Sequence, residues 1–452
     1  IALKILFFIS IVIFIVLFAF APSIGKLIIG SAIGGNTISD IVFVIRAVSL
    51  AILVVPFLSV TRGLLQGYKY ITPYSVSQVI EQVIRVVVIL VGSFLCMRVF
   101  KFPLRYAIGI SMLGAFFGGV VAFIYLRSKI KKSGLLDKVK RDEKIISKQE
   151  IVKKIFMYSI PFILISLVNN LYNTVDMVLL SRTMSDILKY PANMMESIVG
   201  VYTTWGVKLN NIILAISTGL VTSLIPNIVS SYTKNDINDV NDKFNKAMQC
   251  VLLVIVPMTL FLSLLVRPVW TLFYGVSTYG PIVYKVFVFT ALFGGFYSII
   301  INTLQGLSKY KLVMISVALG LLTNALLDVP LMLFFDGLNM NVSYGAVLAA
   351  LIGYTLSISF SMFILKKKYG FVFKSTFKKL PKYLVSYVVF VFVVLILRLI
   401  VPTNLSGRLI QVPILMIYGL VSFGIYIYIS YKNGNLVGVF GNKINKVFEK
   451  KH

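Results

Sequence analysis

Two side chains of opposite charge stand one helical turn apart inside a long apolar segment. Glu81 and Arg85 are four residues apart, and Gln82 lies on a nearby face of the same stretch. An ionised side chain at mid-membrane costs on the order of 2.5 to 3.5 kcal/mol on insertion scales, so it normally faces a partner or an aqueous cavity. Residues at i and i+4 of a helix can pair. Glu81 and Arg85 therefore either neutralise each other in the core, or Arg85 and Gln82 line a polar route through the membrane.

Basic side chains in two other apolar segments also have two interpretations each. Arg46 stands nearer one end of its segment, where it either reaches the headgroups as an anchor or faces a cavity. Lys208 has Asn210 and Asn211 beside it. This group either offers a cation and amide donors to an anionic polar ligand, or anchors its helix at the membrane interface.

Acidic side chains occur in two later apolar segments. The first is Asp176, which shares a polar stripe with asparagines at helical spacing, Asn169, Asn170 and Asn173. Such a stripe either lines a cavity or hydrogen-bonds a neighbouring helix. The second is Asp328, which follows Asn324 by four residues and lies deeper in its segment. Asp328 and Asn324 are candidates to bind a coupling cation or a proton, the alternative being a buried packing role.

Catalytic and metal-binding constellations are not expected. Cys96 and Cys250 are isolated in or beside apolar segments, and the single histidine, His452, is the last residue. This pattern supports neither a disulfide framework nor a thiolate metal site. No set of positioned acids stands out as a glycosyltransferase would require. We therefore expect no catalytic residue, no metal and no cofactor.

The segments that carry these residues are long and numerous enough to cross a membrane many times. The chain has 58% hydrophobic residues and a mean hydropathy of +0.94, and a bilayer needs roughly 20 apolar helical residues per crossing. The sequence predicts an all-α polytopic membrane protein. Runs and breaks place twelve spans at residues 4–29, 41–66, 76–96, 106–126, 155–180, 206–229, 247–266, 284–304, 312–335, 344–365, 383–400 and 410–430.

The net charge of +29 is distributed in a way that argues against nucleic-acid binding. When alternate loops are assigned to the two sides, most Lys and Arg fall on one side, including eleven between residues 127 and 154. This asymmetry is the positive-inside pattern, and it predicts that both chain ends are cytoplasmic. The basic loops are expected to meet anionic lipid headgroups. The loop with Arg98, Lys101 and Arg105 is an exception on the outer side.

Two stretches of the chain nearly repeat each other and divide it into lobes. Arg46 opens an apolar helix that ends at Gly67, and 239 residues later Lys285 opens another that ends at Gly306; both end in Leu-Gln-Gly. The repeat indicates a duplicated bundle, which is typical of transporters. In the second copy, two spans lie between the linker and the apolar run that precedes the repeated helix. In the first copy, that apolar run is the first segment of the chain. We therefore expect two further helices ahead of residue 1, with 14 in the full protein.

The organisation and several motifs resemble a known superfamily. The motifs are Arg62-Gly63-Leu64-Leu65-Gln66-Gly67, Thr72-Pro73, the run from Ser77 to Arg85, Ser159-Ile160-Pro161 leading to Val175-Asp176, and Thr222-Ser223-Leu224-Ile225-Pro226. The chain resembles the multidrug, oligosaccharidyl-lipid and polysaccharide (MOP) exporters, in particular the polysaccharide branch with the stage V sporulation protein B group and Gram-positive lipid II flippases.

The resemblance implies two parallel-repeat lobes followed by two accessory helices. The expected parts are the rest of the first lobe at 1–126, a basic linker at 127–154, the second lobe at 155–366, a basic loop at 367–382, the accessory helices at 383–430 and a tail at 431–452. By resemblance, the accessory helices form a groove for a polyprenyl tail. The family's key arginines on its first two helices have no counterpart in this chain.

The expected function is that of a flippase and not of an enzyme. Its substrate would be a polyprenyl-pyrophosphate-linked saccharide, lipid II or a related precursor, moved by alternating access of two lobes. Membrane lipids and cell-wall synthesis proteins are the other expected partners. Two alternatives remain open: a cation-coupled multidrug antiporter of the same superfamily, and a noncatalytic membrane scaffold of wall synthesis.

Overall fold

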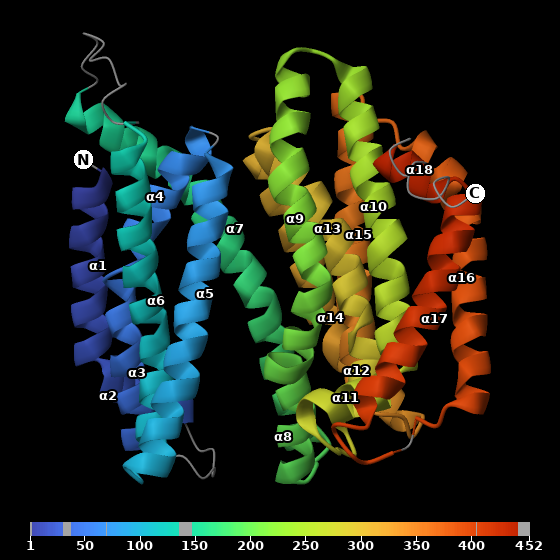
Figure 1. Cartoon of the computed structure of the whole chain (residues 1–452), viewed down its shortest axis with the longest axis horizontal. Helices are drawn as coiled ribbons and strands as arrows, with labels where there is room; N and C mark the ends of the chain where they lie inside the picture. The colour runs from blue at the N-terminus through green and yellow to red at the C-terminus, as the bar shows by residue number, and fades with distance from the viewer. Residues whose placement is uncertain (1, 30–37, 69, 135–146, 404, 442–452) are drawn as a thin grey trace. The chain divides into compact units, whose positions relative to one another are not determined.

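The computed structural model describes residues 2–29, 38–68, 70–134, 147–403 and 405–441 (Figure 1). The chain forms two compact units, Ile1–Ser159 and Ile160–His452. Every segment of regular structure among the described residues is helical. The predicted all-α class is therefore confirmed.

Unit 1 is made of apolar helices. Its helices are α1 (Ala2–Ala19), α2 (Ala21–Ile29), α3 (Ile38–Ile52), α4 (Val55–Gly67), α5 (Ile71–Phe94) with the π turn η1 (Leu95–Val99), α6 (Leu104–Lys132) and the first part of α7 (Lys148–Arg182). Two predicted spans are broken helices. Proline lacks the N–H of a helix interior but suits a first turn. Pro22 and Pro56 accordingly lie at the starts of α2 and α4, so the predicted spans 4–29 and 41–66 each comprise two helices.

Unit 2 holds the remaining helices around a core that includes the fully buried Trp270, Tyr284 and Phe390. They are η2 (Thr183–Ile187), α8 (Ala192–Gly200), η3 (Val201–Trp205), α9 (Gly206–Thr233), α10 (Ile237–Leu264), α11 (Val266–Tyr274), α12 (Gly280–Phe287), α13 (Phe289–Gly306), α14 (Tyr310–Gly337), α15 (Ser343–Tyr369), α16 (Lys374–Ile400), α17 (Gln411–Lys432) and α18 (Asn435–Phe440).

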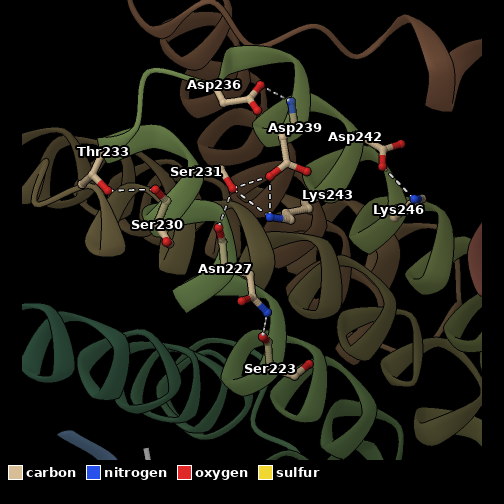
Figure 2. Close-up of polar contacts among 10 residues, drawn as sticks. All are labelled: Ser223, Asn227, Ser230, Ser231, Thr233, Asp236, Asp239, Asp242, Lys243 and Lys246. Atoms are coloured by element: carbon tan, nitrogen blue, oxygen red, sulfur yellow. Dashed lines mark hydrogen bonds and ion pairs between the residues drawn. The ribbon is translucent and has the colours of Figure 1, made fainter. Parts of the chain in front are cut away.

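The turn between α9 and α10 shows how local polar contacts end one span and begin the next (Figure 2). Asp236 accepts a hydrogen bond from the backbone N–H of Asp239 at 3.0 Å, which caps the first turn of α10. The Lys243 ammonium lies 2.5 Å from the Asp239 carboxylate and donates to the Ser231 hydroxyl at 2.7 Å. The carboxylate of Asp239 therefore ties the end of α9 to the first turns of α10.

The two lobes use the same kind of close helix packing, with a glycine of one helix against a backbone carbonyl of its neighbour. In unit 1, a β-carbon on Gly118 of α6 would lie 2.6 Å from the carbonyl oxygen of Glu81 on α5. In unit 2, a β-carbon on Gly353 of α15 would lie 2.6 Å from the carbonyl oxygen of Gly320 on α14. Small residues let membrane helices approach this closely. Glu81 and Gly320 are 239 residues apart, which is the interval between the two Leu-Gln-Gly ends.

Ten helical segments among the described residues are long and apolar enough to cross a membrane. They match ten of the twelve predicted spans. The first predicted span contains only a shorter apolar helix, Ile5–Ala19, and the fifth lies in α7, which is not among the ten. Apolar side chains on these helices remain exposed, for example Val79 at 62% and Leu90 at 65% on α5. A surface of this kind is suited to lipid, and the protein is a multi-pass membrane protein.

Candidate functional site

The predicted pair Glu81 and Arg85 is part of a larger ion cluster. The Arg85 Nη2 atom lies 2.7 Å from Glu81 Oε1, which confirms the pairing across one helical turn. The other carboxylate oxygen, Oε2, lies 2.9 Å from Arg62 Nη1, and Arg62 also donates to the Ser77 hydroxyl at 2.9 Å. One carboxylate thus meets two guanidinium groups. The cluster retains a net positive charge.

Two donors of this cluster remain available. Arg62 Nη2 and Arg85 Nε are buried and have no hydrogen-bond partner among the described residues. A buried donor without a partner carries a desolvation penalty of about 1 to 3 kcal/mol. The side chains of Arg62 and Glu81 are only 15% and 13% exposed, whereas that of Arg85 is 33% exposed. Arg85 can therefore interact with the surroundings of α5, and the exposed Gln82 accepts a long hydrogen bond from it at 3.5 Å.

Arg46 lies apart from that cluster on α3. Its Nε donates to the carbonyl oxygen of Phe18 on α1 at 3.5 Å, and its guanidinium sits 4.9 Å from the centre of the Phe18 ring. The side chain is exposed. A cation over an aromatic face is stabilised by the ring quadrupole, so Arg46 joins α3 to α1 and keeps its charge at the surface of unit 1.

A second polar cluster forms inside unit 2 and brings together residues that the sequence analysis treated separately. The Asn324 amide on α14 donates a hydrogen bond to Asp176 Oδ1 on α7. Asn324 and Asp328 are fully buried, and Asp176 is 8% exposed. Both carboxylate oxygens of Asp328 and the amide oxygen of Asn324 have no partner among the described residues. Asp176 and Asp328 interact with each other, so two carboxyl groups and an amide meet in the interior of one unit.

Tyrosines and a glycine close the space around this second cluster. The Tyr172 hydroxyl donates to the carbonyl oxygen of Ala350 at 3.1 Å, and the rings of Tyr172 and Tyr354 stack at 5.1 Å. A β-carbon on Gly353 would meet both the Tyr172 hydroxyl and the β-carbon of Asn324. The predicted cavity residue Asn173 is in α7, but its side chain lies outside the described residues, as do those of Asn169 and Asn170.

The polar residues near the start of α9 lie on two different faces of the helix. Asn210 is buried, its amide donates to Thr290 at 2.9 Å, and its side-chain oxygen accepts from the Tyr284 hydroxyl at 3.2 Å. Lys208 and Asn211 are exposed. Asn210 therefore belongs to helix packing, whereas Lys208 and Asn211 face away from that contact.

Comparison with known proteins identifies the family of this chain. A model of the polysaccharide biosynthesis protein family matches residues 2–232, a little more than half of the chain. The chain belongs to this family. The lipid II flippase MurJ of Bacillus subtilis is 28% identical over 451 residues, which cover 97% of this chain and 81% of that protein. An uncharacterised membrane protein of the same organism, YabM, is 26% identical over 220 residues, or 48% of this chain and 40% of that one.

Solved structures show that the fold is shared beyond the family. A structure of lipid II flippase MurJ in an inward closed conformation matches with a TM-score of 0.64 and 18% identity, covering 94% of this chain and 80% of that one. A MOP superfamily transporter from Pyrococcus furiosus matches with a TM-score of 0.61 and 15% identity, covering 81% and 78%. The predicted MOP fold is confirmed. Two of these matched proteins are named as a lipid II flippase and as a MOP superfamily transporter.

Arg62 is the residue that sequence reasoning missed. It was named only as the first residue of the Arg-Gly-Leu-Leu-Gln-Gly motif that supported the resemblance, and not as a candidate site residue. The available signal was a basic residue near the end of one apolar segment, with the acid Glu81 inside the next apolar segment. Ser77, which lies on the same face of α5 as Glu81, completes the contact.

Proposed function

We propose that this chain is a flippase that moves a polyprenyl-pyrophosphate-linked saccharide, lipid II or a close relative of it, across the bacterial cell membrane by alternating access. The observation that carries the proposal is the match to lipid II flippase MurJ along 97% of this chain. Headgroups of sugars and phosphates do not cross hydrocarbon unaided, because their polar groups lose hydration without gaining partners. A protein that supplies buried cationic donors removes that penalty.

The Arg62, Glu81 and Arg85 cluster is the proposed interaction site for the substrate's phosphates in unit 1. Its excess positive charge and its two unpartnered donors suit an anion. Glu81 holds both guanidinium groups in place. Arg46, Gln82, Lys208 and Asn211 remain proposed contacts of the substrate, because each is a polar side chain exposed on a long apolar helix.

An apolar groove in unit 2 is the proposed site for the polyprenyl tail. Its volume is about 560 Å³, and it is formed by α10, α13 and α16. Lining side chains include Val256, Leu260, Phe289, Leu384, Val388 and Phe392. Helix α16 is the first of the two accessory helices that the sequence associated with a tail groove. Isoprenoid carbon is stabilised in such a groove by burial of apolar surface.

The Asp176, Asn324 and Asp328 cluster is the proposed coupling site. Two carboxylates and an amide supply oxygen ligands, and oxygens without partners are suited to a small hard cation or to a proton. Binding there would neutralise buried charge, so α7 and α14 would pack differently with and without the cation. The membrane potential is a second source of energy. The membrane potential, about 100 mV and inside negative, favours outward movement of negative charge. Two pyrophosphate charges that move outward gain about 4 to 5 kcal/mol from it.

The proposed orientation has both chain ends in the cytoplasm, as the distribution of basic loops favours. In that orientation the α9–α10 turn faces inward and the α14–α15 loop faces outward. Proteins of cell-wall synthesis are the proposed partners, because they make and consume the transported precursor.

Complementation tests the proposal. Cells depleted of their own lipid II flippase would express the full-length protein, and growth and accumulated lipid-linked precursor would be measured. We expect growth with precursor near the undepleted level. Protection from cationic dyes without any change in precursor would favour a multidrug antiporter. Failure with a normally inserted protein would favour another polyprenyl-linked glycan.

A combined variant separates transport from a scaffold role. We expect Arg85→Gln, Lys208→Gln and Asp176→Asn together to abolish rescue. The matched control is Lys367→Gln, Lys378→Gln and Asp242→Asn, which changes the charge equally at exposed positions and should rescue fully. Rescue by the first variant would favour a scaffold.

A further inference from the structure

Unit 2 contains another cavity, which none of the clusters described above uses. Its volume is about 550 Å³. Figure 1 places its helices α8 and α12 at the end of unit 2 opposite the α9–α10 turn. Three segments distant in sequence supply its polar and aromatic lining: the residues around η2 and α8, the start of α12, and the α14–α15 loop. The residues relevant here are Tyr190, Tyr279, Asp336, Asn339, Asn341 and Tyr344.

Hydrogen bonds hold this pocket in a fixed shape. The Tyr190 hydroxyl donates to Asp336 Oδ1 at 2.5 Å, which joins the segment before α8 to the end of α14. Burial and the neighbouring Asp336 raise the pKa of Tyr190 to about 12, so this hydroxyl remains a donor at neutral pH. Asn341 accepts hydrogen bonds from the backbone N–H and the hydroxyl of Ser343 and so fixes the start of α15. The lining is therefore largely preorganised.

Two aromatic faces in the pocket have no aromatic neighbour. Tyr344 packs edge-on against Phe335 at 6.2 Å, whereas Tyr190 and Tyr279 form no ring pair with another described aromatic residue. Both pack against the apolar core of unit 2 and are half-buried in the pocket wall. Aromatic faces carry a negative quadrupole, which attracts the polarised C–H groups on one face of a pyranose ring. Asp336 and the exposed amide of Asn339 lie in the same pocket, within reach of hydroxyl groups on a ring held there.

Other ligand classes fit the lining less well. A phosphate would be repelled by Asp336. A divalent cation needs six or more oxygen ligands and usually several carboxylates, and Asp336 is the one carboxylate among the described lining residues. The volume is in the usual range for a small-molecule site. Aromatic faces beside a carboxylate also suit an organic cation, which makes such a cation the competing ligand.

We propose that this pocket is a saccharide-binding site in which Tyr190 and Tyr279 stack on a pyranose ring and Asp336 accepts its hydroxyl groups. The ligand class rests on the proposed function, because a flippase for lipid-linked saccharides presents sugars at this membrane face. The sugar has two sources, the headgroup of the lipid-linked saccharide and the polymeric glycan outside the membrane.

Calorimetric titration of N,N′-diacetylchitobiose into the full-length protein in nanodiscs tests the site. We expect a dissociation constant of about 1 to 10 mM for the unsubstituted protein. Tyr279→Ala and Asp336→Asn should each weaken binding about tenfold. Tyr279→Phe keeps the ring and should bind within about twofold of the unsubstituted protein, which separates stacking from misfolding. Tyr428→Ala and Asp186→Asn are the matched controls at exposed positions outside the pocket and should change nothing.

Two results would overturn the site. One is the absence of saccharide binding at about 50 mM, five times the weakest expected constant. The other is binding of tetraphenylphosphonium that Asp336→Asn abolishes while the saccharide does not bind. Titration with a lipid-linked saccharide separates the two sources. If Tyr279→Ala weakens the binding of both ligands, the bound sugar is the headgroup. If it weakens the binding of the soluble saccharide alone, the bound sugar belongs to the polymer. Translocation in vesicles is measured in parallel. Translocation without saccharide binding refutes this pocket alone, and saccharide binding without translocation refutes the flippase.

Discussion

Arg62 and Glu81 form an ion pair of 2.9 Å that joins the end of α4 to the middle of α5. Because Arg85 approaches the other oxygen of the same carboxylate at 2.7 Å, Glu81 is shared by two cations. A partly buried carboxylate in this position does more than neutralise its helix neighbour. It fixes the angle between two helices and holds two guanidinium groups that would otherwise repel each other.

Removing the shared carboxylate should destabilise unit 1 more than removing either cation. We expect Glu81→Gln to lower the free energy of unfolding by about 2 kcal/mol, between the values for exposed and buried pairs. Thermal unfolding of the full-length protein in detergent measures the change. Glu196→Gln, at an exposed position on α8, is the control and should have no effect.

A double-mutant cycle shows whether the effect is pairwise. Combining Glu81→Gln with Arg62→Gln should recover part of the loss, because the uncompensated guanidinium is removed as well. Strictly additive losses would mean that Arg62 and Glu81 do not interact in the folded protein.

The buried acids of unit 2 should make stability depend on the cation in solution. If sodium binds at Asp176, Asn324 and Asp328, sodium at ten times its dissociation constant should stabilise the protein by about 1.4 kcal/mol relative to choline. Asp328→Asn should abolish this difference. Thermal unfolding in sodium and choline chloride at equal ionic strength provides the measurement.

Asp186→Asn is the control for that experiment, because Asp186 is exposed and bonds only to Ser185 among the described residues. Its sodium response should equal that of the unsubstituted protein. No sodium response in the unsubstituted protein, together with a stability that falls as the pH rises, would point to a proton and not a metal cation.

Much of the scaffold was predictable, because membrane helices depend on local composition. Ten spans, the helix ends at Gly67 and Gly306, and the Glu81–Arg85 pair all follow from residues close together in sequence. The breaks at Pro22 and Pro56 were visible as well, but apolar runs of that length also fit single helices.

Contacts between helices were less accessible to sequence reasoning. Asp176 and Asn324 are 148 residues apart, and each showed only that it needed a polar partner. The internal repeat contained a usable signal, since Asn324 follows Arg85 by the same 239 residues that separate Gly67 from Gly306. Arg85 in the first lobe and Asn324 in the second occupy equivalent helix positions, but one side chain is a cation and the other a neutral amide. This equivalence was not evident from the residue types alone.

Close helix packing gives a further prediction. Gly118→Ala places a β-carbon 2.6 Å from the carbonyl oxygen of Glu81, so α5 and α6 must move apart. We expect a loss of about 1 to 3 kcal/mol in the free energy of unfolding. Gly63→Ala is the matched control, because a β-carbon there meets nothing within 4 Å. It should be neutral or stabilising, because alanine favours helix. Equal effects of both substitutions on the unfolding temperature would contradict the packing argument.

Asn210 and Asn211 are adjacent on α9, and substituting each one tests whether their side chains have different roles. Asn210→Ala removes hydrogen bonds to Thr290 and Tyr284 in the core and leaves their hydroxyls with fewer partners, so it should lower the free energy of unfolding by about 1 to 3 kcal/mol. Asn211→Ala, one residue along at an exposed position, should leave unfolding unchanged and reduce translocation if Asn211 meets the substrate. Residues i and i+1 of a helix point about 100° apart, so one substitution should act on stability and the other on transport. A drop in unfolding temperature with Asn211→Ala but not with Asn210→Ala would reverse this assignment.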